Sequence, residues 1–179
     1  MKYLQILLFL AVNAQIYSQD VDIITFHPDR KLIWDDFRGL PDYSDSSKAA
    51  QISTTIQLRS DNVNFWTGKA QFVGSAIMYK SKSWVKPGFE NDYVLSHEQI
   101  HFDIAYIAVK KLEADINALN VNILNKSIID AMYKNWHAIF LLNEMTYDLM
   151  TDGGNDIDMQ RHYQKKTEGE LKVLLESIF

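Results

Sequence analysis

The sequence contains no cysteine. A chain without cysteine cannot carry a disulfide framework, a thiolate-bound zinc site, a thiol nucleophile or a lipid-modified cysteine anchor. It also lacks a cluster of basic residues, and its formal net charge at pH 7 is -5, which argues against a nucleic-acid partner. Repeats, low-complexity segments and apolar runs long enough for a transmembrane helix are missing too. At 179 residues the sequence therefore predicts a single domain.

The N-terminal segment has the features of a targeting signal. A positive residue near the start is followed by an apolar run over 4–12 that only Gln5 interrupts. This run is too short to span a bilayer, and polar residues follow it at once. We expect a signal peptide over residues 1–18, cleaved after Ala14 or Ser18, and an exported, periplasmic or secreted chain without further membrane association. A buried N-terminal helix is the alternative.

Residues 21–90 have the composition of β-strands separated by turns. β-Branched and apolar residues dominate 21–26, and apolar residues alternate with polar ones over 52–58. Turn-forming residues at 60–62 predict a hairpin that joins the second of these strands to a short strand over 63–66.

A longer strand is expected over 70–79, with Gly74 marking a β-bulge. We expect residues 83–85 to extend this strand, and Pro87-Gly88 to end it. Earlier in the chain, the segment 32–39 is rich in apolar and aromatic residues. Its aromatic side chains are expected to fill the core; lining a substrate pocket is the alternative.

The rest of the sequence is predicted to be helical. Periodicity indicates three helices, from a cap at Asn91 to about Leu119, from a capping box at Ser127 and Asp130 to about Met150, and from about Ile157 onward. Glycines after the second helix are typical of a helix end. The sequence thus predicts one α+β domain over residues 19–179, in which N-terminal antiparallel strands pack on the long first helix and two further helices follow.

The first predicted helix contains His97-Glu98-Gln99-Ile100-His101, the H-E-x-x-H pattern of zinc hydrolases. Histidines four residues apart lie one above the other on a helix, so both imidazoles can bind one metal ion. Glu98 then lies beside them, where it can take a proton from a water on the metal. The helical wheel places both histidines among apolar residues, and buried imidazoles are unfavourable without partners. A shared Zn²⁺ satisfies both; plain core histidines are the alternative.

A zinc site of this kind needs a third protein ligand. Glu144 and Asp148 lie four residues apart on the second predicted helix and share one of its faces. Polar neighbours on this face are typical of a solvated surface, whereas Leu141 and Met145 beside it favour a cleft. Residues 143–148 also resemble the N-E-x-x-x-D segment of thermolysin-like zinc proteases, in which the glutamate binds the metal.

Several segments together resemble one known family. Residues 97–104, HEQIHFDI, resemble the HEQxHFDI core of a bacterial family of exported proteins. That family is catalogued as a domain of unknown function and described as zinc-dependent proteases of zincin type. Three further segments match. Residues 32–39 resemble the family's L-x-W-x-D-F-x-G segment, and residues 83–85 resemble the strand before its active-site helix. Residues 147–151 resemble its Y-D-x-x-T segment. The resemblance covers about residues 32–163.

The resemblance implies a zincin-like fold and a zinc-dependent peptidase that acts on a protein or peptide. Its Tyr-Asp match implies that Asp148, ahead of Glu144, joins the histidines as a metal ligand, or else accepts a hydrogen bond from a ligand imidazole. Asp152 and His162 are further candidates. By analogy with zincins, an edge strand aligns an extended substrate, and we assign this role to residues 70–79.

The sequence departs from the family at one position. The family pattern continues Y-D-x-x-T-x-H, and Gly153 stands where that histidine would be. If the histidine binds metal in the family, this chain lacks that ligand. Two alternatives to an active peptidase follow: a catalytically silent metal-binding or interaction protein on a zincin-like fold, and an exported structural module whose histidines are core residues.

Overall fold

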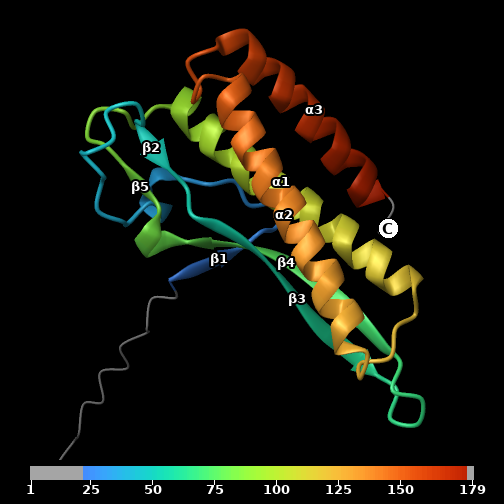
Figure 1. The fold of residues 1–179 in the computed structure, drawn as a ribbon. Helices are drawn as coiled ribbons and strands as arrows, with labels where there is room; N and C mark the ends of the chain where they lie inside the picture. Colours follow the sequence, from blue (N-terminus) through green and yellow to red (C-terminus); the bar gives the residue numbers. More distant parts are fainter. Residues whose placement is uncertain (1–21, 177–179) are drawn as a thin grey trace, which may run out of the picture.

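The computed structural model, which describes residues 22–176, contains a small antiparallel sheet and three long helices (Figure 1). The first helix, α1 (Asp92–Ala118), packs against the sheet, and α2 (Lys126–Met150) and α3 (Ile157–Glu176) pack against α1. This arrangement confirms the expected α+β fold, with strands first and helices after them. The expected signal peptide lies outside the described residues.

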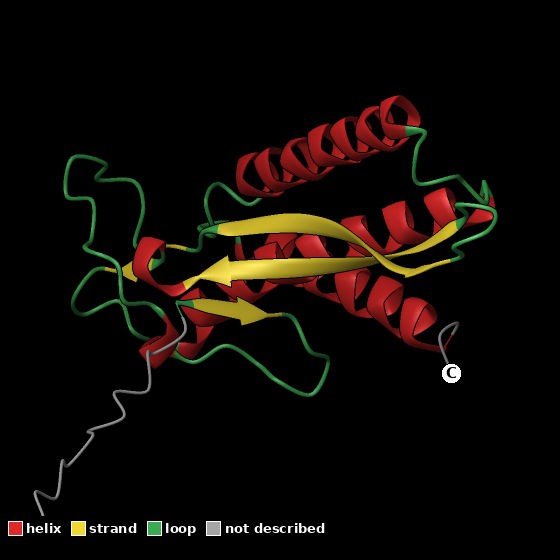
Figure 2. Ribbon diagram, turned by 90° about the horizontal axis from the view of Figure 1, so that it is seen from below, coloured by secondary structure: helices red, strands yellow, loops and turns green. Residues whose placement is uncertain are grey.

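The strands form two sheets. In the larger one, β1 (Ile23–Thr25), β4 (Ala70–Tyr79) and β3 (Thr54–Val63) lie side by side in that order, all antiparallel. The smaller sheet pairs β2 (Ala50–Gln51) with β5 (Trp84–Val85). Figure 2 views the molecule from the side of the sheet, with the long strands in front.

The hairpin turn lies later than the sequence predicted. β3 continues through residues 60–62 to Val63, because an irregular register between Ser60 and Val63 accommodates the turn-forming residues inside the strand. The turn itself is closed by Asn64, whose side-chain oxygen accepts the N–H groups of Trp66 and Thr67 at 3.0 Å each. The expected short strand over 63–66 is therefore wrong.

Gly74 marks a close approach to a helix, and the predicted bulge there is wrong. A Cβ at this position would lie 2.6 Å from Val109 Cγ2 and 2.7 Å from the Val109 carbonyl oxygen. Beside it, Glu113 Oε2 accepts the Gly74 N–H at 2.7 Å, and the Asn117 amide bonds both backbone groups of Phe72. Side chains of α1 thus complete the hydrogen bonding of β4 where β1 does not reach.

Residues 84–85 do not extend β4, in contrast to the sequence prediction. A 3₁₀ turn, η2 (Lys80–Lys82), follows β4 and redirects the chain to the smaller sheet. The fully buried Ser83 hydroxyl donates to the Tyr79 carbonyl at 2.7 Å and accepts the Ser53 N–H at 2.9 Å. These two bonds join the end of β4 to the segment between β2 and β3 through one side chain.

The helix ends follow the sequence in part. Asn91 caps α1 as predicted, since its side-chain oxygen accepts the Val94 N–H at 3.0 Å. The predicted capping box at Ser127 is wrong, because α2 begins at Lys126 and Ser127 lies inside its first turn. Backbone φ angles of +58° at Gly153 and +89° at Gly154 follow the end of α2. Within residues 22–176, no helix has the length and apolarity needed to cross a membrane.

The aromatic segment before β2 fills the core, as predicted. It forms a 3₁₀ turn, η1 (Trp34–Asp36), flanked by Leu32 and Phe37, both of which are buried. Nearby, the Phe26 ring stacks on Tyr106 of α1 with centroids 4.1 Å apart. This packing holds the first half of α1 against the N-terminal segment and so fixes the helix that carries the H-E-x-x-H residues.

Alanine substitutions at two glycines, one in contact with α1 and one in open space, should change the free energy of unfolding in opposite directions. Gly74→Ala should lower the free energy of unfolding by about 1–3 kcal/mol, as overpacking does, because the Val109 backbone cannot move aside alone. Gly169→Ala on α3, where a Cβ meets nothing within 4 Å, should raise it by about 0.5–1 kcal/mol. Urea unfolding followed by circular dichroism measures both; equal midpoints would contradict the packing described.

Candidate metal centre

The H-E-x-x-H histidines project from adjacent turns of α1 toward α2. His97 and His101 are each 7% exposed, and their ring centroids lie 5.0 Å apart at an interplanar angle of 79°. The apolar residues of α1 on the same side pack into the core, which places both imidazoles at the boundary between core and cleft. Helical spacing therefore brings the two rings together as the sequence predicted.

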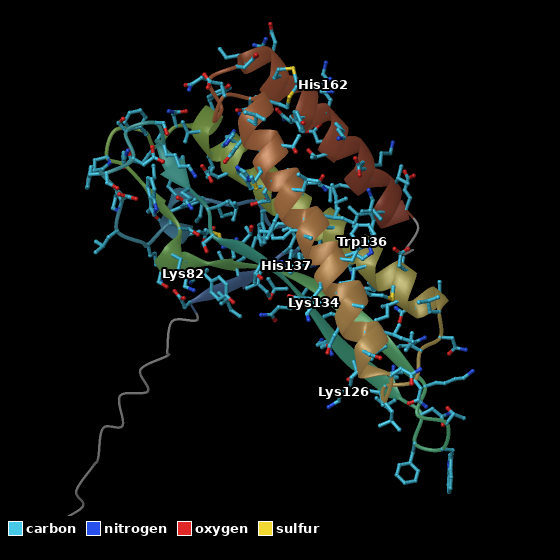
Figure 3. The ribbon with its side chains drawn as sticks, viewed as in Figure 1. Lys82, Lys126, Lys134, Trp136, His137 and His162 are labelled. Atoms are coloured by element: carbon cyan, nitrogen blue, oxygen red, sulfur yellow. The ribbon has the colours of Figure 1, made fainter. Side chains whose placement is uncertain are left out.

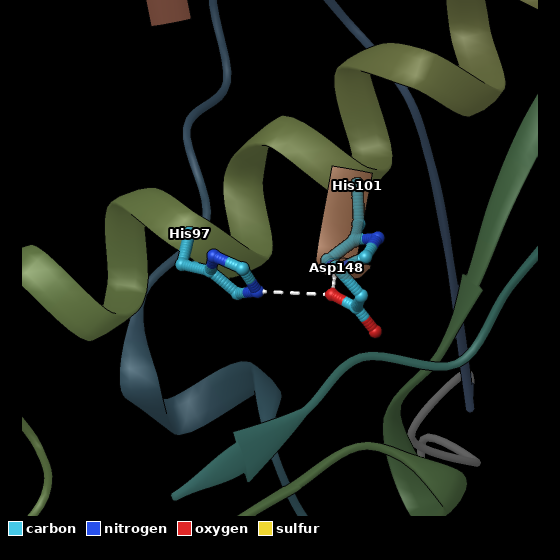
Figure 4. Close-up of side chains that lie close together, drawn as sticks. All are labelled: His97, His101 and Asp148. Carbon is cyan, nitrogen blue, oxygen red and sulfur yellow. Dashed lines mark hydrogen bonds and ion pairs between the residues drawn. The ribbon is translucent and has the colours of Figure 1, made fainter. Parts of the chain in front are cut away.

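Asp148 of α2 meets both histidines. Its Oδ1 lies 3.2 Å from His97 Nε2 and 2.9 Å from His101 Nε2 (Figure 4). Donor atoms of the three residues all lie within 4.8 Å of one another. Ligands about 2.0–2.2 Å from a tetrahedral metal are themselves about 3.3 Å apart, close to the two contacts of Asp148. These three residues could hold a metal ion.

The hydrogen bonds of Gln160 favour one tautomer of His97. The Gln160 amide nitrogen donates to the Tyr93 carbonyl at 3.2 Å and to the Ser96 hydroxyl at 3.0 Å. Its oxygen therefore faces His97 and accepts from Nδ1 at 3.2 Å. With the proton on Nδ1, Nε2 turns its lone pair toward Asp148, which is the tautomer that binds a metal. Two acceptors at this distance repel each other unless a cation lies between them, so the donor set fits a metal ion.

His101 lies between two carboxylates of α2. Glu144 Oε1 lies 3.2 Å from Nδ1 of His101, on the side of the ring opposite Asp148. Burial lowers the pKa of His101, but Glu144 and Asp148 outweigh it and raise the pKa to about 10. The Glu144 contact lies outside hydrogen-bond geometry, and both of its atoms are buried with no other partner in the described chain. Glu144 is thus placed to orient His101 from the far nitrogen, while Asp148 shares the metal-facing side.

Tyr147 packs against both imidazoles from behind. Its fully buried ring stacks on His97 with centroids 4.7 Å apart, and it meets the edge of His101 at 4.9 Å. The hydroxyl lies 2.9 Å from His97 Nδ1. Burial, followed by the charges of Glu98 and Asp148, raises the pKa of Tyr147 far above its ordinary value, so the phenol stays neutral. Tyr147 therefore restricts both rings without adding charge to the site.

Glu98 is buried beside the histidines and faces the same cleft. Only 3% of it is exposed, and its Oε2 accepts the backbone N–H of Ile52 at 2.7 Å. Burial raises the pKa of Glu98, while the neighbouring histidines oppose this. For Asp148, burial raises the pKa, but the contacts with the His101 and His97 rings outweigh it and hold the pKa below its usual range. Three carboxylates around two imidazoles make this a site that favours a cation.

A cleft of about 810 Å³ opens over these residues. One wall is the loop over residues 43–49 together with β2, and the other is formed by α2 and the loop over 153–155. Gly154 comes so close to the site that a Cβ there would lie 3.1 Å from His97 Nδ1. Gly153 also lines the cleft, but a Cβ there would meet nothing within 4 Å. The candidate metal centre is therefore open to a substrate-sized molecule from one side.

The structure brings together four of the residues singled out from the sequence and separates two others. The four residues that lie together are His97, Glu98, His101 and Asp148. Glu144 lies behind His101. His162 is exposed on α3, away from the cluster (Figure 3), and Asp152 is exposed just past α2.

Sequence reasoning missed Gln160. The sequence does contain a signal for it. Gln160 has the helical spacing that places it on the same face of the third helix as Tyr163, Thr167 and Leu171, among apolar or small side chains. A buried amide on such a stripe requires polar partners, and the structure supplies them in Tyr93, Ser96 and His97.

Comparison of the chain with protein-family models, with curated proteins and with solved structures finds no match. The family resemblance of the motifs therefore stays an expectation.

The different positions of the two carboxylates predict different losses of metal affinity. Asp148→Asn should weaken Zn²⁺ binding at least about 10- to 100-fold, because it changes a group on the metal-facing side of both imidazoles. Glu144→Gln, the matched change behind His101, should weaken it less. Competition with a chelating indicator measures both constants. A larger loss in Glu144→Gln would reverse the assignment.

Gln160 should act on the metal through His97. Gln160→Leu removes the acceptor that holds the Nδ1 proton, so Zn²⁺ affinity should fall about 10-fold or more, as changes behind a ligand usually cause. Gln164→Leu, one turn further along the exposed side of α3, is the control and should leave affinity unchanged. The pH dependence of Zn²⁺ binding should also change in Gln160→Leu only, since a loss of packing alone would not alter it. Equal affinities for the two variants would exclude this role.

Proposed function

We propose that this chain is an exported, zinc-dependent peptidase in which His97, His101 and Asp148 hold the metal and Glu98 is the general base. The observation that carries the proposal is the convergence of these four side chains on the floor of one open cleft. When bound, zinc would supply a Lewis acid for a carbonyl group and lower the pKa of a water molecule. Zinc is the metal proposed because two imidazoles and one carboxylate match its catalytic sites.

Each protein group has a task that follows from its place. The Gln160 contact holds His97 in the tautomer with a free Nε2, and Tyr147 packs against both rings. The Ile52 N–H holds Oε2 of Glu98, which leaves the other carboxylate oxygen to accept a proton. The open cleft above lets an extended chain reach these groups without unfolding of the domain.

The strand that aligns a substrate is better assigned to β2 than to β4. The expectation for residues 70–79 is wrong, because β4 lies between β1 and β3 in its sheet and does not line the cleft. β2 lines the cleft, and within residues 22–176 it pairs only with β5.

The backbone of β2 supports this assignment. The backbone N–H of Lys86 donates to the Ala49 carbonyl. The backbone N–H and C=O groups of Ala49 and Gln51 therefore point toward β5. Antiparallel pairs alternate in this way, and the N–H and C=O groups of Ala50 therefore point to the other side, the side on which the Ile52 N–H reaches Glu98. A peptide laid along this edge would pair with Ala50 beside the metal centre.

A catalytically silent metal-binding protein is the second candidate. Gly153 in the cleft favours it, because the resembling family has a histidine at this position. Against it, the cleft already collects three protein donors without residue 153, which is the number that catalytic zinc sites use. The peptidase is therefore the function that this donor set supports better.

The role of Glu98 can be separated from metal binding. Glu98→Gln keeps the size of the side chain and an acceptor for the Ile52 N–H but removes the base. Cleavage of a peptide library should fall by about 10²-fold or more, while Zn²⁺ stays bound. Mass spectrometry of the products and metal analysis of the same sample give both values.

Two outcomes decide between the candidates. Unchanged turnover in Glu98→Gln would exclude Glu98 as the base. Zinc retained by the parent chain without cleavage of any library peptide would favour the silent metal-binding protein.

A further inference from the structure

The tip of the β3–β4 hairpin carries an exposed aromatic pair. Phe65 is 88% exposed and Trp66 is 89% exposed, and their rings contact each other with centroids 5.4 Å apart at 84°. Large aromatic side chains are normally buried or at interfaces, and neither ring packs on the core. Figure 1 shows this turn extending beyond the ends of the helices. The pair therefore forms the apex of a projecting, convex end of the molecule.

The loop between α1 and α2 adds aliphatic side chains to the same end. The Asn122 side chain donates to the Thr67 carbonyl at 2.7 Å, and the Ile123 N–H donates to the Gly68 carbonyl at 2.8 Å. Leu124 in this loop is 79% exposed. The loop and the turn are thus joined by hydrogen bonds, and the exposed apolar residues that they carry at this end are here called the apolar tip: Phe65, Trp66 and Leu124.

Four backbone N–H groups of the turn have partners within the molecule. Asn64 accepts the N–H groups of Trp66 and Thr67 with its side chain, and that of Gly68 with its carbonyl oxygen at 2.8 Å. The Lys69 N–H donates to the Thr67 hydroxyl at 3.3 Å. Unpaired amide groups are the main obstacle to placing a loop in an apolar medium, and these four need no partner from outside.

The charges around the apolar tip are suited to an anionic surface. Lys69 and Lys126 are both exposed, one at the end of the turn and the other at the start of α2. On the strand before the turn, Arg59 is paired with Asp61 at 3.2 Å and adds no net charge. Cationic residues beside aromatic ones are the combination found where proteins meet the headgroup region of a bilayer.

We propose that the apolar tip docks on an anionic lipid bilayer, with Phe65 and Trp66 inserted among the headgroups and Lys69 and Lys126 against lipid phosphates. A bilayer fits better than a protein partner because the tip is convex and small, and because the N–H groups of residues 66–69 already have partners, so the tip needs no complementary groove. Docking of this kind is a contact with the membrane surface. It replaces the expectation that the processed chain has no membrane association.

The tip and the metal centre lie at opposite ends of α1. His101 is in the first half of this helix and Ala118 is its last residue, which separates them by roughly 25 Å along the axis at 1.5 Å per residue. Docking by the tip therefore leaves the cleft open and away from the lipid. The proposal does not depend on the proposed peptidase activity.

Vesicle binding and one fluorescence signal test the proposal. The full chain should co-sediment with vesicles of phosphatidylglycerol and phosphatidylcholine and more weakly with phosphatidylcholine alone. Phe65→Ser with Trp66→Ser should lower the partition coefficient about 10-fold or more, and Lys69→Glu with Lys126→Glu about 5-fold per lysine. The control is Leu40→Ser with Val173→Ser, two residues that are 93% and 67% exposed elsewhere, and it should bind as the parent does.

Brominated lipid separates tip docking from any other contact, including one through the N-terminal residues that all variants share. Trp66→Phe should remove most of the tryptophan emission that brominated vesicles quench in the parent. Equal quenching in the parent and in Trp66→Phe would overturn the proposal, and so would equal binding by the Phe65→Ser, Trp66→Ser variant. A soluble protein partner that needs the tip, combined with no vesicle binding, would also overturn it. Circular dichroism of each variant shows that the fold is retained.

Discussion

One carboxylate oxygen between two imidazoles determines the arrangement of α1 and α2. Asp148 meets His97 and His101 from the opposite helix, and each of the three would be an unfavourable buried or half-buried polar group without the others. Three buried or half-buried carboxylates, Glu98, Glu144 and Asp148, surround the two imidazoles, so the site could hold a cation. Gln160 and Tyr147 then restrict the rings, which links the third helix to the same position. The cleft, Glu98 and the loop after α2 all lie around this contact.

The sequence predicted those parts of the fold that depend on periodicity. The three helices, the long strand over 70–79 and the Asn91 cap all follow from local patterns that need no knowledge of distant residues. The same is true of the two histidines and Glu98, since helical spacing alone places them together. Asp148 could be named only because a helix face and a motif match pointed to it.

The errors lie where distant contacts override local signals. Turn-forming residues at 60–62 stay inside β3 because pairing with β4 continues past them through an irregular register. The sequence predicts a bulge at Gly74. In the structure a side chain is excluded there because Val109, 35 positions away in the sequence, lies too close. Gln160 and the pairing of β2 with β5 depend in the same way on partners in other elements. Such partners leave no periodic trace in a single sequence.

X-ray absorption at the zinc edge of the zinc-loaded protein tests the central claim most directly, because it reports the ligands of the metal without an assay of activity. The account predicts two imidazole rings with nitrogen at about 2.0–2.1 Å and carboxylate or water oxygen at about 2.0–2.2 Å. Loss of one ring from the spectrum in His97→Ala, and of the other in His101→Ala, would complete the assignment. A spectrum of the parent chain with oxygen ligands alone would contradict a metal centre at His97, His101 and Asp148.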